Sequence, residues 1–420
     1  MTTYINLLRT NSDYTKLWLS GAVSQIGDWF NVIVLLALVS EYTDGSGLAV
    51  SLFLLARIVP PLLITPYAGV LADKLNRKTI LIVTDILRAI IVLMFLLSTG
   101  AETLWLIYVL TTAQFSLTAI FEPAKSAILP NLVEHKDIIT ANTIGSITWS
   151  AMLAIGALLG GIVAGALGIT VALIIDALTY LLSALLTLRI QSYQQPVAEI
   201  KSSKVQVKPN QIIEGLRYAR ANPQVAMSLI VKAGGAVGST DTLMTIFATQ
   251  IFVTMNSGGE ASLGLMYGTT GIGAVLGPIL LNRFHDGSNA QMRKAILWGF
   301  TLLTLGWVII GQASALWIVA LGLGVRAMGG SANWTYSSAM IQQTTDDQYL
   351  GRMFSLETTL MHTIGILSTI GTGALIDSLG TGQVHIVAWI IAGLSLIPLI
   401  GWWLLTQYTS KHTSRLMPSY

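Results

Sequence analysis

Long apolar runs, separated by short polar segments, dominate the pattern of this chain of 420 residues. A helix that crosses a hydrocarbon core of ~30 Å needs about 20 apolar residues. Twelve runs approach or exceed that length, and each predicts a membrane-spanning helix. They cover residues 14–41, 47–72, 79–99, 103–124, 140–165, 168–189, 224–255, 261–282, 294–311, 314–340, 352–377 and 383–406.

The one long polar interruption covers residues 190–223 and divides the chain into two sets of six runs. Its second part, residues 211–220, has the pattern of an amphipathic helix that lies on a membrane surface. We therefore predict an N-terminal six-helix half over 1–189, a cytoplasmic linker over 190–223 and a C-terminal six-helix half over 224–420. Asp241 lies 213 residues after Asp28, at the corresponding depth of the second half, which favours an internal repeat.

Composition excludes a soluble protein. Charged residues make up 10% of the chain and hydrophobic residues 53%, and the mean hydropathy is +0.68. A typical soluble domain has about 25% charged residues. The net charge of +3 is too small and too scattered for a nucleic-acid-binding surface, so no nucleic-acid partner is expected. The pattern is that of an all-α protein whose solvent includes membrane lipid.

The loops differ in charge, and this predicts the orientation. Lys and Arg occur in alternate loops, at residues 74–78, in the linker 190–223 and at residues 283–294, whereas the loops between them contain neither. Cytoplasmic loops carry the excess of Lys and Arg. We therefore expect a multi-pass protein of a bacterial-type inner (plasma) membrane with both termini in the cytoplasm.

A few charged residues fall inside the apolar runs. A charge near the bilayer centre costs about 2.5–3.5 kcal/mol on insertion scales, so each one requires a partner or a function. A structural ion pair is the alternative for each, and Arg57 could also bind carbonyl groups freed by Pro60 and Pro61. The residues expected to form a proton-coupling cavity are Asp28, Arg57, Asp176, Asp241 and Arg326.

Pairs of opposite charge lie nearer the cytoplasmic ends. Asp85 and Arg88 are three residues apart on one helical face, as are Glu122 and Lys125. Each pair is expected either to form a simple ion pair or to take part in gating. Polar and aromatic residues at cavity depth are expected to line a site for a bulky amphipathic substrate: Gln25, Trp29, Phe30, Asn333 and Trp334.

The loop between the second and third runs reads GVLADKLNRK over residues 69–78. It resembles the signature of the major facilitator superfamily, G-x-L-A-D-R-x-G-R-R/K, with Lys74 and Asn76 as departures. Asn76 is expected to keep the turn of the usual Gly because Asn tolerates a positive φ. The resemblance implies a cytoplasmic gate that contains Gly69, Asp73, Arg77 and Lys78, with Asp73 meeting the eleventh helix near Arg352. Asp85, Arg88 and Glu122 are the further candidates for this gate.

Residues 121–133, FEPAKSAILPNLV, followed by Ala141 and Asn142, are similar to a segment of the exporters of macrolides and of the siderophore enterobactin. GALLGG, at residues 156–161, resembles the exporter motif G-P-x-x-G-G with Ala157 in place of Pro. Drug–proton antiporters often carry an Arg in the fourth helix, but residues 103–124 contain none. The coupling ion therefore stays open between the proton and sodium.

The resemblance implies two pseudo-symmetric halves of six helices and a secondary-active exporter. We expect it to move a drug, macrolide-like compound or siderophore out of the cytoplasm by alternating access, with proton antiport. The alternatives are a lysophospholipid or lipid transporter and a solute importer of the same fold. The chain has no P-loop, HExxH or GxSxG motif and no Cys, so neither an enzyme nor a metal or other cofactor is expected. A monomer suffices for this superfamily.

Overall fold

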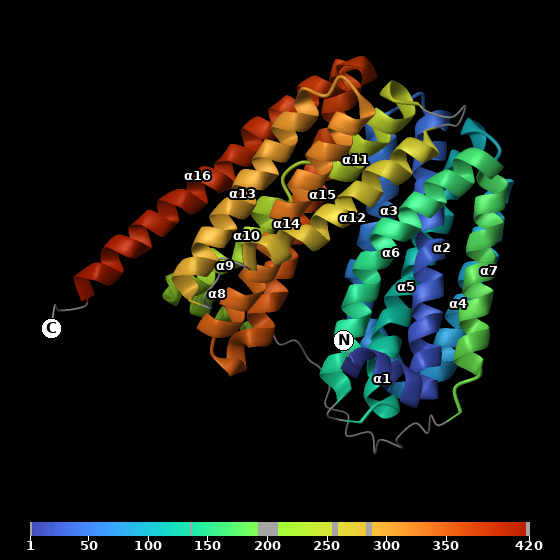
Figure 1. Ribbon diagram of the computed structural model, residues 1–420, viewed down its shortest axis with the longest axis horizontal. Coiled ribbons are helices and arrows are strands. Elements are labelled where there is room, and N and C mark those ends of the chain that lie inside the picture. The colour runs from blue at the N-terminus through green and yellow to red at the C-terminus, as the bar shows by residue number, and fades with distance from the viewer. Residues whose placement is uncertain (1, 135–136, 192–208, 254–258, 283–287, 417–420) are drawn as a thin grey trace. The chain divides into compact units, whose positions relative to one another are not determined.

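The computed structural model describes residues 2–134, 137–191, 209–253, 259–282 and 288–416 (Figure 1). Helices joined by short turns make up these ranges, and no strand occurs in them. Within them, ten helical segments are long and apolar enough to cross a membrane. The two remaining predicted runs, 224–255 and 314–340, coincide with a broken helix and with α14 (Leu316–Thr344).

The first half of the chain contains seven α-helices of the described part, three of which begin with an ordinary side-chain N-cap. Asn11, Ser46 and Asn76 accept hydrogen bonds from the backbone N–H groups of the first turns of α2, α3 and α4. The helices are α1 (Thr2–Thr10), α2 (Ser12–Tyr42), α3 (Gly47–Lys74), α4 (Arg77–Met94), α5 (Leu104–Leu132), α6 (Ile138–Leu167) and α7 (Ile169–Leu188).

Asn76 differs from its expected conformation. Its φ is −64°, so the expectation of a positive φ is wrong. Its side chain accepts a hydrogen bond from the N–H of Thr79 at 3.2 Å. Asn therefore replaces the Gly of the signature because it caps α4, and not because it tolerates a left-handed turn.

The amphipathic helix predicted in the linker is present as α8 (Pro209–Ala221). The helices that follow α8 in the described part are α9 (Pro223–Leu229), α10 (Val231–Gly235), α11 (Thr240–Ile246), the π-helix η4 (Phe247–Ile251), α12 (Glu260–Asn282), α13 (Asn289–Gly311), α14, α15 (Asp347–Leu379) and α16 (Val384–Leu416). Short 3-10 turns lie at Phe95–Leu97, Ala101–Thr103 and Thr381–Gln383.

The prediction of one continuous helix over 224–255 is wrong, because the chain unwinds between α10 and α11. Gly238 has φ +79°, a conformation that favours glycine. The freed N–H of Ser239 donates to the Thr372 hydroxyl of α15 at 3.0 Å. The break falls in the short polar stretch Gly238-Ser239-Thr240-Asp241-Thr242, which hydropathy averaged over a whole span does not resolve.

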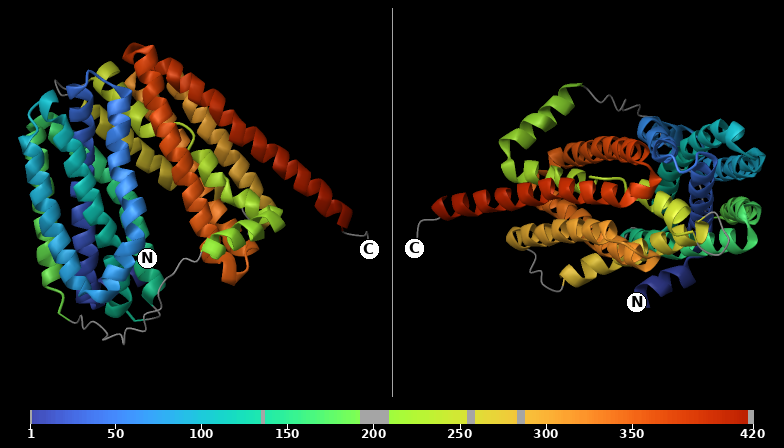
Figure 2. Two further views of the ribbon diagram at one scale, coloured as in Figure 1. Left: turned by 180° about the vertical axis from the view of Figure 1, so that it is seen from behind. Right: turned by 90° about the horizontal axis from the view of Figure 1, so that it is seen from above.

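The described chain forms two compact units, the first comprising Met1–Lys201 with Met244–Gly268 and the second Ser202–Leu243 with Thr269–Tyr420. In the first unit, α2 packs against α6 and α7, and α5 packs against α3 and α4. The hydroxyl groups of Ser40 and Thr249 lie 2.6 Å apart and join α2 to η4. Figure 2 shows the helices of this unit as a bundle from two further directions.

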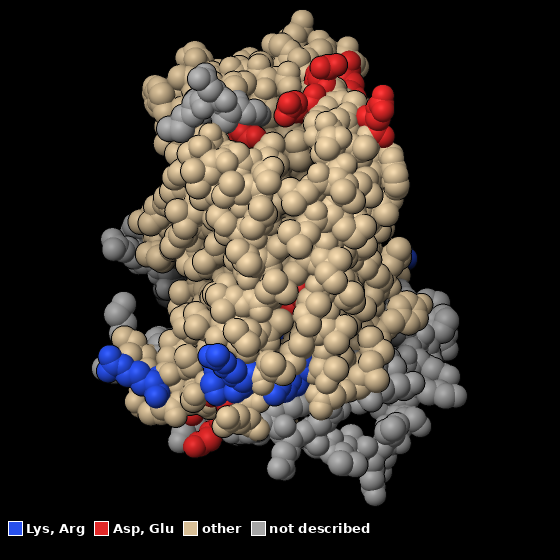
Figure 3. Space-filling model, turned by 90° about the vertical axis from the view of Figure 1, so that its right-hand side faces the viewer, with Lys and Arg blue, Asp and Glu red and all other residues tan. Residues whose placement is uncertain are grey.

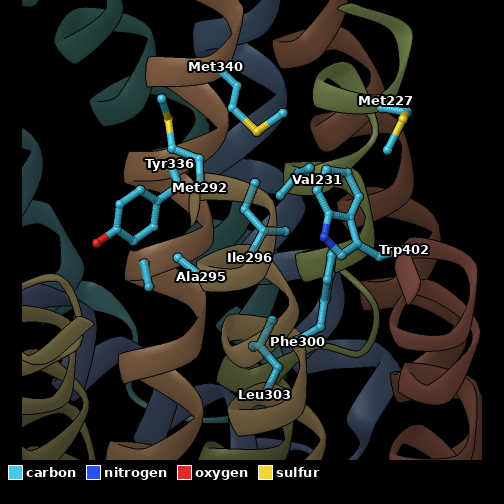
Figure 4. Close-up of a cluster of buried hydrophobic side chains, with 11 residues drawn as sticks. Met227, Val231, Met292, Ala295, Ile296, Phe300, Leu303, Tyr336, Met340 and Trp402 are labelled. Carbon is cyan, nitrogen blue, oxygen red and sulfur yellow. The ribbon is translucent and has the colours of Figure 1, made fainter. Parts of the chain in front are cut away.

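The second unit has an apolar core between α13, α14 and α16 (Figure 4). Phe300 of α13 and Trp402 of α16 lie with their ring centres 6.3 Å apart. Met292 and Ile296 of α13 pack with Tyr336 of α14 in the same cluster. This packing holds α14, the helix that carries Arg326 and Trp334, against α13.

Charge follows the ends of the helices. On the face drawn in Figure 3, Lys and Arg lie near one end, most Asp and Glu lie near the other, and the wide band between them is almost free of charge. Such a band is typical of a surface that faces lipid.

Glycines let α13 and α14 approach closely. A Cβ atom at Gly306 would lie 2.7 Å from the carbonyl oxygen of Gly322 and 2.8 Å from the Cα of Arg326. Backbone atoms on the opposing helix cannot move aside as the end of a side chain can. Close van der Waals packing between small residues stabilises such an interface, because lipid provides no hydrophobic driving force between helices.

We therefore expect Gly306→Ala to destabilise the protein by about 1–3 kcal/mol through overpacking. Gly401→Ala is the matched control, because a Cβ there meets no atom within 4 Å. The control should be neutral or stabilise by up to about 1 kcal/mol through helix propensity. Thermal unfolding in detergent measures both changes, and equal effects of the two substitutions would contradict the packing argument.

Candidate functional site

A cavity of about 500 Å³ lies within the first unit. Its wall consists of residues of α2 between Tyr14 and Asp28, of α5 between Thr118 and Leu129, and of α6 between Ala141 and Trp149. Gln25, Asp28 and Glu122 are candidate residues from the sequence that lie on this wall. The volume falls in the range of about 300–1,000 Å³ that is usual for drug-sized ligands.

Asp28 is held on one side by a buried hydrogen-bond chain. The hydroxyl of Tyr180 on α7 donates to the Asp28 carboxylate. The side-chain amide of Gln114 on α5 donates to the oxygen of the same hydroxyl at 3.1 Å. Tyr180 is fully buried and Gln114 is almost so. Asp28 therefore has one oxygen oriented by protein while the residue also borders the open cavity.

Arg88 is the buried cation behind this chain. It forms a salt bridge with Asp85, and the side chains of the two residues are 1% and 0% exposed. The Ser183 hydroxyl donates to the second Asp85 oxygen at 2.7 Å. The guanidinium carbon lies 4.2 Å from the ring centre of Phe121 and 4.6 Å from that of Tyr180. Arg88 thus fixes the ring whose hydroxyl binds Asp28.

Asp176 is a second buried carboxyl group beside Asp28. It is 0% exposed, and it faces Asn31 of α2. A Cβ at Gly27 would collide with an Asp176 oxygen, so only glycine at position 27 leaves room for this carboxylate. Asp28 and Asp176 interact electrostatically with each other and with Arg88. Asp176 does not border the cavity, whereas Asp28 does.

Glu122 and Lys125 form a looser pair on the cavity wall. Their charged atoms are 3.8 Å apart, and the side chains are 56% and 23% exposed. Lys125 reaches from α5 across to α2, where a Cβ at Gly21 would lie 2.8 Å from its ammonium nitrogen. Both residues interact electrostatically with Asp28.

The loop residues of the predicted gate connect helices of the first unit. Arg77 donates to the carbonyl of Ala127 at 2.8 Å, and Lys78 donates to the carbonyl of Ile190 at 2.7 Å. The side chain of Asp73 lies outside the described part, so its meeting with Arg352 stays a prediction. Arg352 pairs with Glu214 of α8 at 3.0 Å in the second unit.

The second unit contains a buried ion pair that the sequence did not indicate. Lys232 of α10 donates to Glu357 of α15 at 2.8 Å and to the Ser338 hydroxyl of α14 at 2.9 Å. The Ser337 hydroxyl donates to the other Glu357 oxygen at 3.1 Å. The ammonium also lies 4.2 Å from the ring centre of Trp334. Lys232 is therefore a buried charge with a charged partner.

Arg326 and Asp241 lie in the second unit and interact electrostatically, and the Arg326 guanidinium is 4.8 Å from the ring centre of Trp307. Arg57 of α3 lies 5.1 Å from the ring centre of Phe115 in the first unit. Neither guanidinium borders the cavity that contains Asp28. A shared coupling role for these groups stays a prediction.

The predicted aromatic lining residues pack elsewhere. Trp29 lies beside Gly156 with its ring centre 5.4 Å from that of Tyr267, and Phe30 is buried against Gly160. Thus the GALLGG segment of α6 provides space for α2. In the second unit, Asn333 is buried against Gly299, whereas Trp334 is 53% exposed.

A family model described as Major Facilitator Superfamily matches residues 17–292. The chain belongs to the major facilitator superfamily. Solved structures show the same fold. The nucleoside transporter NupG has a TM-score of 0.73 at 14% identity, over 94% of this chain and 98% of NupG. A bacterial homolog to the human lysosomal transporter Spinster has a TM-score of 0.71 at 14% identity, over 95% and 97% of the two chains.

Relatives in sequence are transporters of the same superfamily. YfiS of Bacillus subtilis, an MFS-type transporter, is 25% identical over 94% of both chains. BacE of the same organism, named as a candidate bacilysin exporter, is 24% identical over 96% of this chain and 95% of its own length. The staphyloferrin A transporter of Staphylococcus aureus is 24% identical over 81% and 82%. This transporter is accordingly a multi-pass integral membrane protein.

Sequence reasoning missed several groups of the site. Tyr180 was detectable in part, because it stands four residues after Asp176 and shares its helical face. Nothing in the sequence marks Gln114 and Ser183 as part of the site, because single polar residues are common in transporter helices. Lys125 was visible only as the neighbour of Glu122, and its reach across Gly21 depends on the packing of α5 against α2.

The buried pair predicts a specific pattern of stability. Arg88→Met should destabilise the transporter by about 3–5 kcal/mol, because it leaves Asp85 buried without its cation. Adding Asp85→Leu to Arg88→Met should recover more than half of that loss. Lys16→Met is the control, since it removes a more exposed partner of an i,i+3 pair at 2.8 Å and should cost under about 1 kcal/mol. Thermal unfolding in detergent measures all three, and a double variant as unstable as Arg88→Met would contradict the pairing argument.

Proposed function

We propose that this transporter is a secondary-active exporter that moves a bulky amphipathic small molecule out of the cytoplasm in exchange for protons. Asp28 is the coupling carboxylate in this proposal. The observation that carries it is the position of Asp28, which borders the cavity on one side and accepts the Tyr180 hydrogen bond on the other. The name of BacE, a candidate bacilysin exporter, supports export, and that of the staphyloferrin A transporter supports a small-molecule substrate.

Proton binding at this site has a simple electrostatic basis. Asp28, Asp85, Asp176 and Glu122 are grouped around two bases, Arg88 and Lys125. Four ionised carboxylates with two cations leave a negative excess in a region of low dielectric constant. A proton bound by Asp28 reduces this excess, and a change in cavity hydration or contents can release it.

The remaining candidates take different roles in the proposal. Asp85 and Arg88 position Tyr180, because they are fully buried and paired with one another, and the Ser183 hydroxyl donates to the second Asp85 oxygen. We place the cytoplasmic gate in the loop from Gly69 to Lys78 and at Arg352, on the strength of the superfamily signature. The protein is proposed to act as a monomer in the plasma membrane with both termini in the cytoplasm.

The experiment begins with a pump-deficient bacterial host that expresses the transporter. Its susceptibility to macrolides, siderophores, peptide antibiotics and lysophospholipids is measured with and without an uncoupler. The compound that gives uncoupler-sensitive resistance is then tested in everted membrane vesicles, where antiport releases protons from the vesicle lumen and a pH-sensitive dye reports the release.

We expect Asp28→Asn to reduce proton release and substrate uptake by about 100-fold or more while it leaves protein level and thermal stability close to wild type, since a proton acceptor is lost but the volume is kept. Asp44→Asn is the matched control: Asp44 is an exposed loop residue with φ +49°, which Asn tolerates. Full coupled transport by Asp28→Asn would refute its role. Uptake driven by a sodium gradient alone would show that sodium, and not the proton, is the coupling ion. Accumulation of the substrate in intact cells would show that the protein is an importer.

A further inference from the structure

We propose that the cavity in the first unit binds a zwitterionic amphipathic solute, with the solute's ammonium group at Glu122 and its carboxylate at Lys125. This inference rests on the proposed exporter function and names the substrate class for it. A free amino acid with a large apolar side chain, or a short peptide, has this chemistry.

The pair of Glu122 and Lys125 is available to a ligand. A separation of 3.8 Å is longer than a charge-assisted hydrogen bond, and both side chains are partly exposed on the cavity wall. Exposed pairs of this kind contribute about 0–1 kcal/mol. A solute that presents an ammonium and a carboxylate can therefore replace the internal contact at little cost.

The other ion pair of the first unit's interior is closed by comparison. Asp85 and Arg88 are 0% and 1% exposed, and Ser183 satisfies the second Asp85 oxygen. Breaking such a pair leaves a buried charge without a partner, which costs about 3–5 kcal/mol. Of these two pairs, only that of Glu122 and Lys125 can exchange its partner with a ligand.

Lys125 is positioned by a glycine on the facing helix. Its ammonium group lies over Gly21 of α2, where any side chain would occupy the same space. The aromatic ring of Phe121 lies 5.7 Å from this ammonium. The cation is thus kept at the junction of α2 and α5, 3.8 Å from a Glu122 oxygen, and the two charges can receive opposite ends of one solute.

Apolar groups complete the wall. Trp18 and Trp149 both border the cavity, and Trp149 is 56% exposed. The indole N–H of Trp18 donates to the Thr148 hydroxyl at 2.8 Å, which fixes the ring. Leu17 and Leu129 extend this surface. An aromatic or branched side chain of the solute fits these groups, whereas a purely apolar lipid leaves both charges unused.

The test uses the purified full-length transporter in detergent and three probes that differ only in charge. The probes are the dipeptide phenylalanyl-leucine, its N-acetyl derivative, which lacks the ammonium, and its C-terminal amide, which lacks the carboxylate. Isothermal titration measures binding. We expect the free dipeptide to bind at least 10-fold more tightly than either derivative. Equal binding of the three probes, or no binding of the dipeptide, would overturn the proposal.

Variants test which protein charge binds which end of the dipeptide. Glu122→Gln should weaken binding of the dipeptide to the level of the N-acetyl derivative and leave that derivative unchanged. Lys125→Met should weaken it to the level of the amide, and Gly21→Ala should act in the same direction because it displaces the ammonium group. Lys16→Met removes a lysine of a similar pair outside this cavity and should keep the preference of the wild type. Unaltered preferences in Glu122→Gln and Lys125→Met would refute the assignment.

The outcome is separable from that of the export experiment. Proton-coupled export of another compound that depends on Asp28, without binding of the dipeptide, would refute the substrate class and retain the exporter. Charge-dependent binding of the dipeptide without coupled transport would retain the substrate class and refute the proton-coupled exporter.

Discussion

The cost of burying charge in a medium of low dielectric constant governs the interior of the first unit. Arg88 is 1% exposed, and its cation is compensated by the Asp85 salt bridge and by the faces of two aromatic rings. One of these rings is Tyr180, which binds Asp28 through its hydroxyl. The geometry of Asp28, the proposed coupling carboxylate, therefore depends on a cation that does not border the cavity. Moving or neutralising that cation would change both the position and the charge balance of Asp28.

Close helix packing makes this arrangement possible. Gly27 leaves room for the Asp176 carboxylate between α2 and α7, and Gly21 leaves room for the Lys125 ammonium between α2 and α5. In the second unit, Gly306 and Gly322 let α13 and α14 meet through their backbones. Glycine has two functions here, since it increases contact where lipid gives no hydrophobic driving force, and it provides space for charged groups within a helix interface.

The sequence predicted the spans and the linker helix well, because hydropathy and amphipathic spacing are local properties. It also predicted the pair of Asp85 and Arg88, which share one helical face. It failed where the outcome depends on contacts distant in sequence. The hydrogen bond of Tyr180 to Asp28 joins residues 152 positions apart, and the Lys232 pair joins residues 125 positions apart. The break before α11 was also missed, because hydropathy averaged over a whole span hides the short stretch of glycine and polar residues at 238–242.

In the proposed exporter, the two ion pairs that interact electrostatically with Asp28 give a route for exchange. The inner pair is closed and holds Tyr180, whereas the outer pair of Glu122 and Lys125 can open to the cavity. The ammonium of a zwitterionic solute at Glu122 adds positive charge near Asp28, and its carboxylate at Lys125 adds negative charge. Release of the Asp28 proton therefore requires the ammonium to act on Asp28 more strongly than the carboxylate does. A proton that binds Asp28 removes negative charge from the same wall and weakens its hold on the ammonium. Proton and cationic group would then oppose each other through electrostatics alone, which is the requirement for antiport at one site.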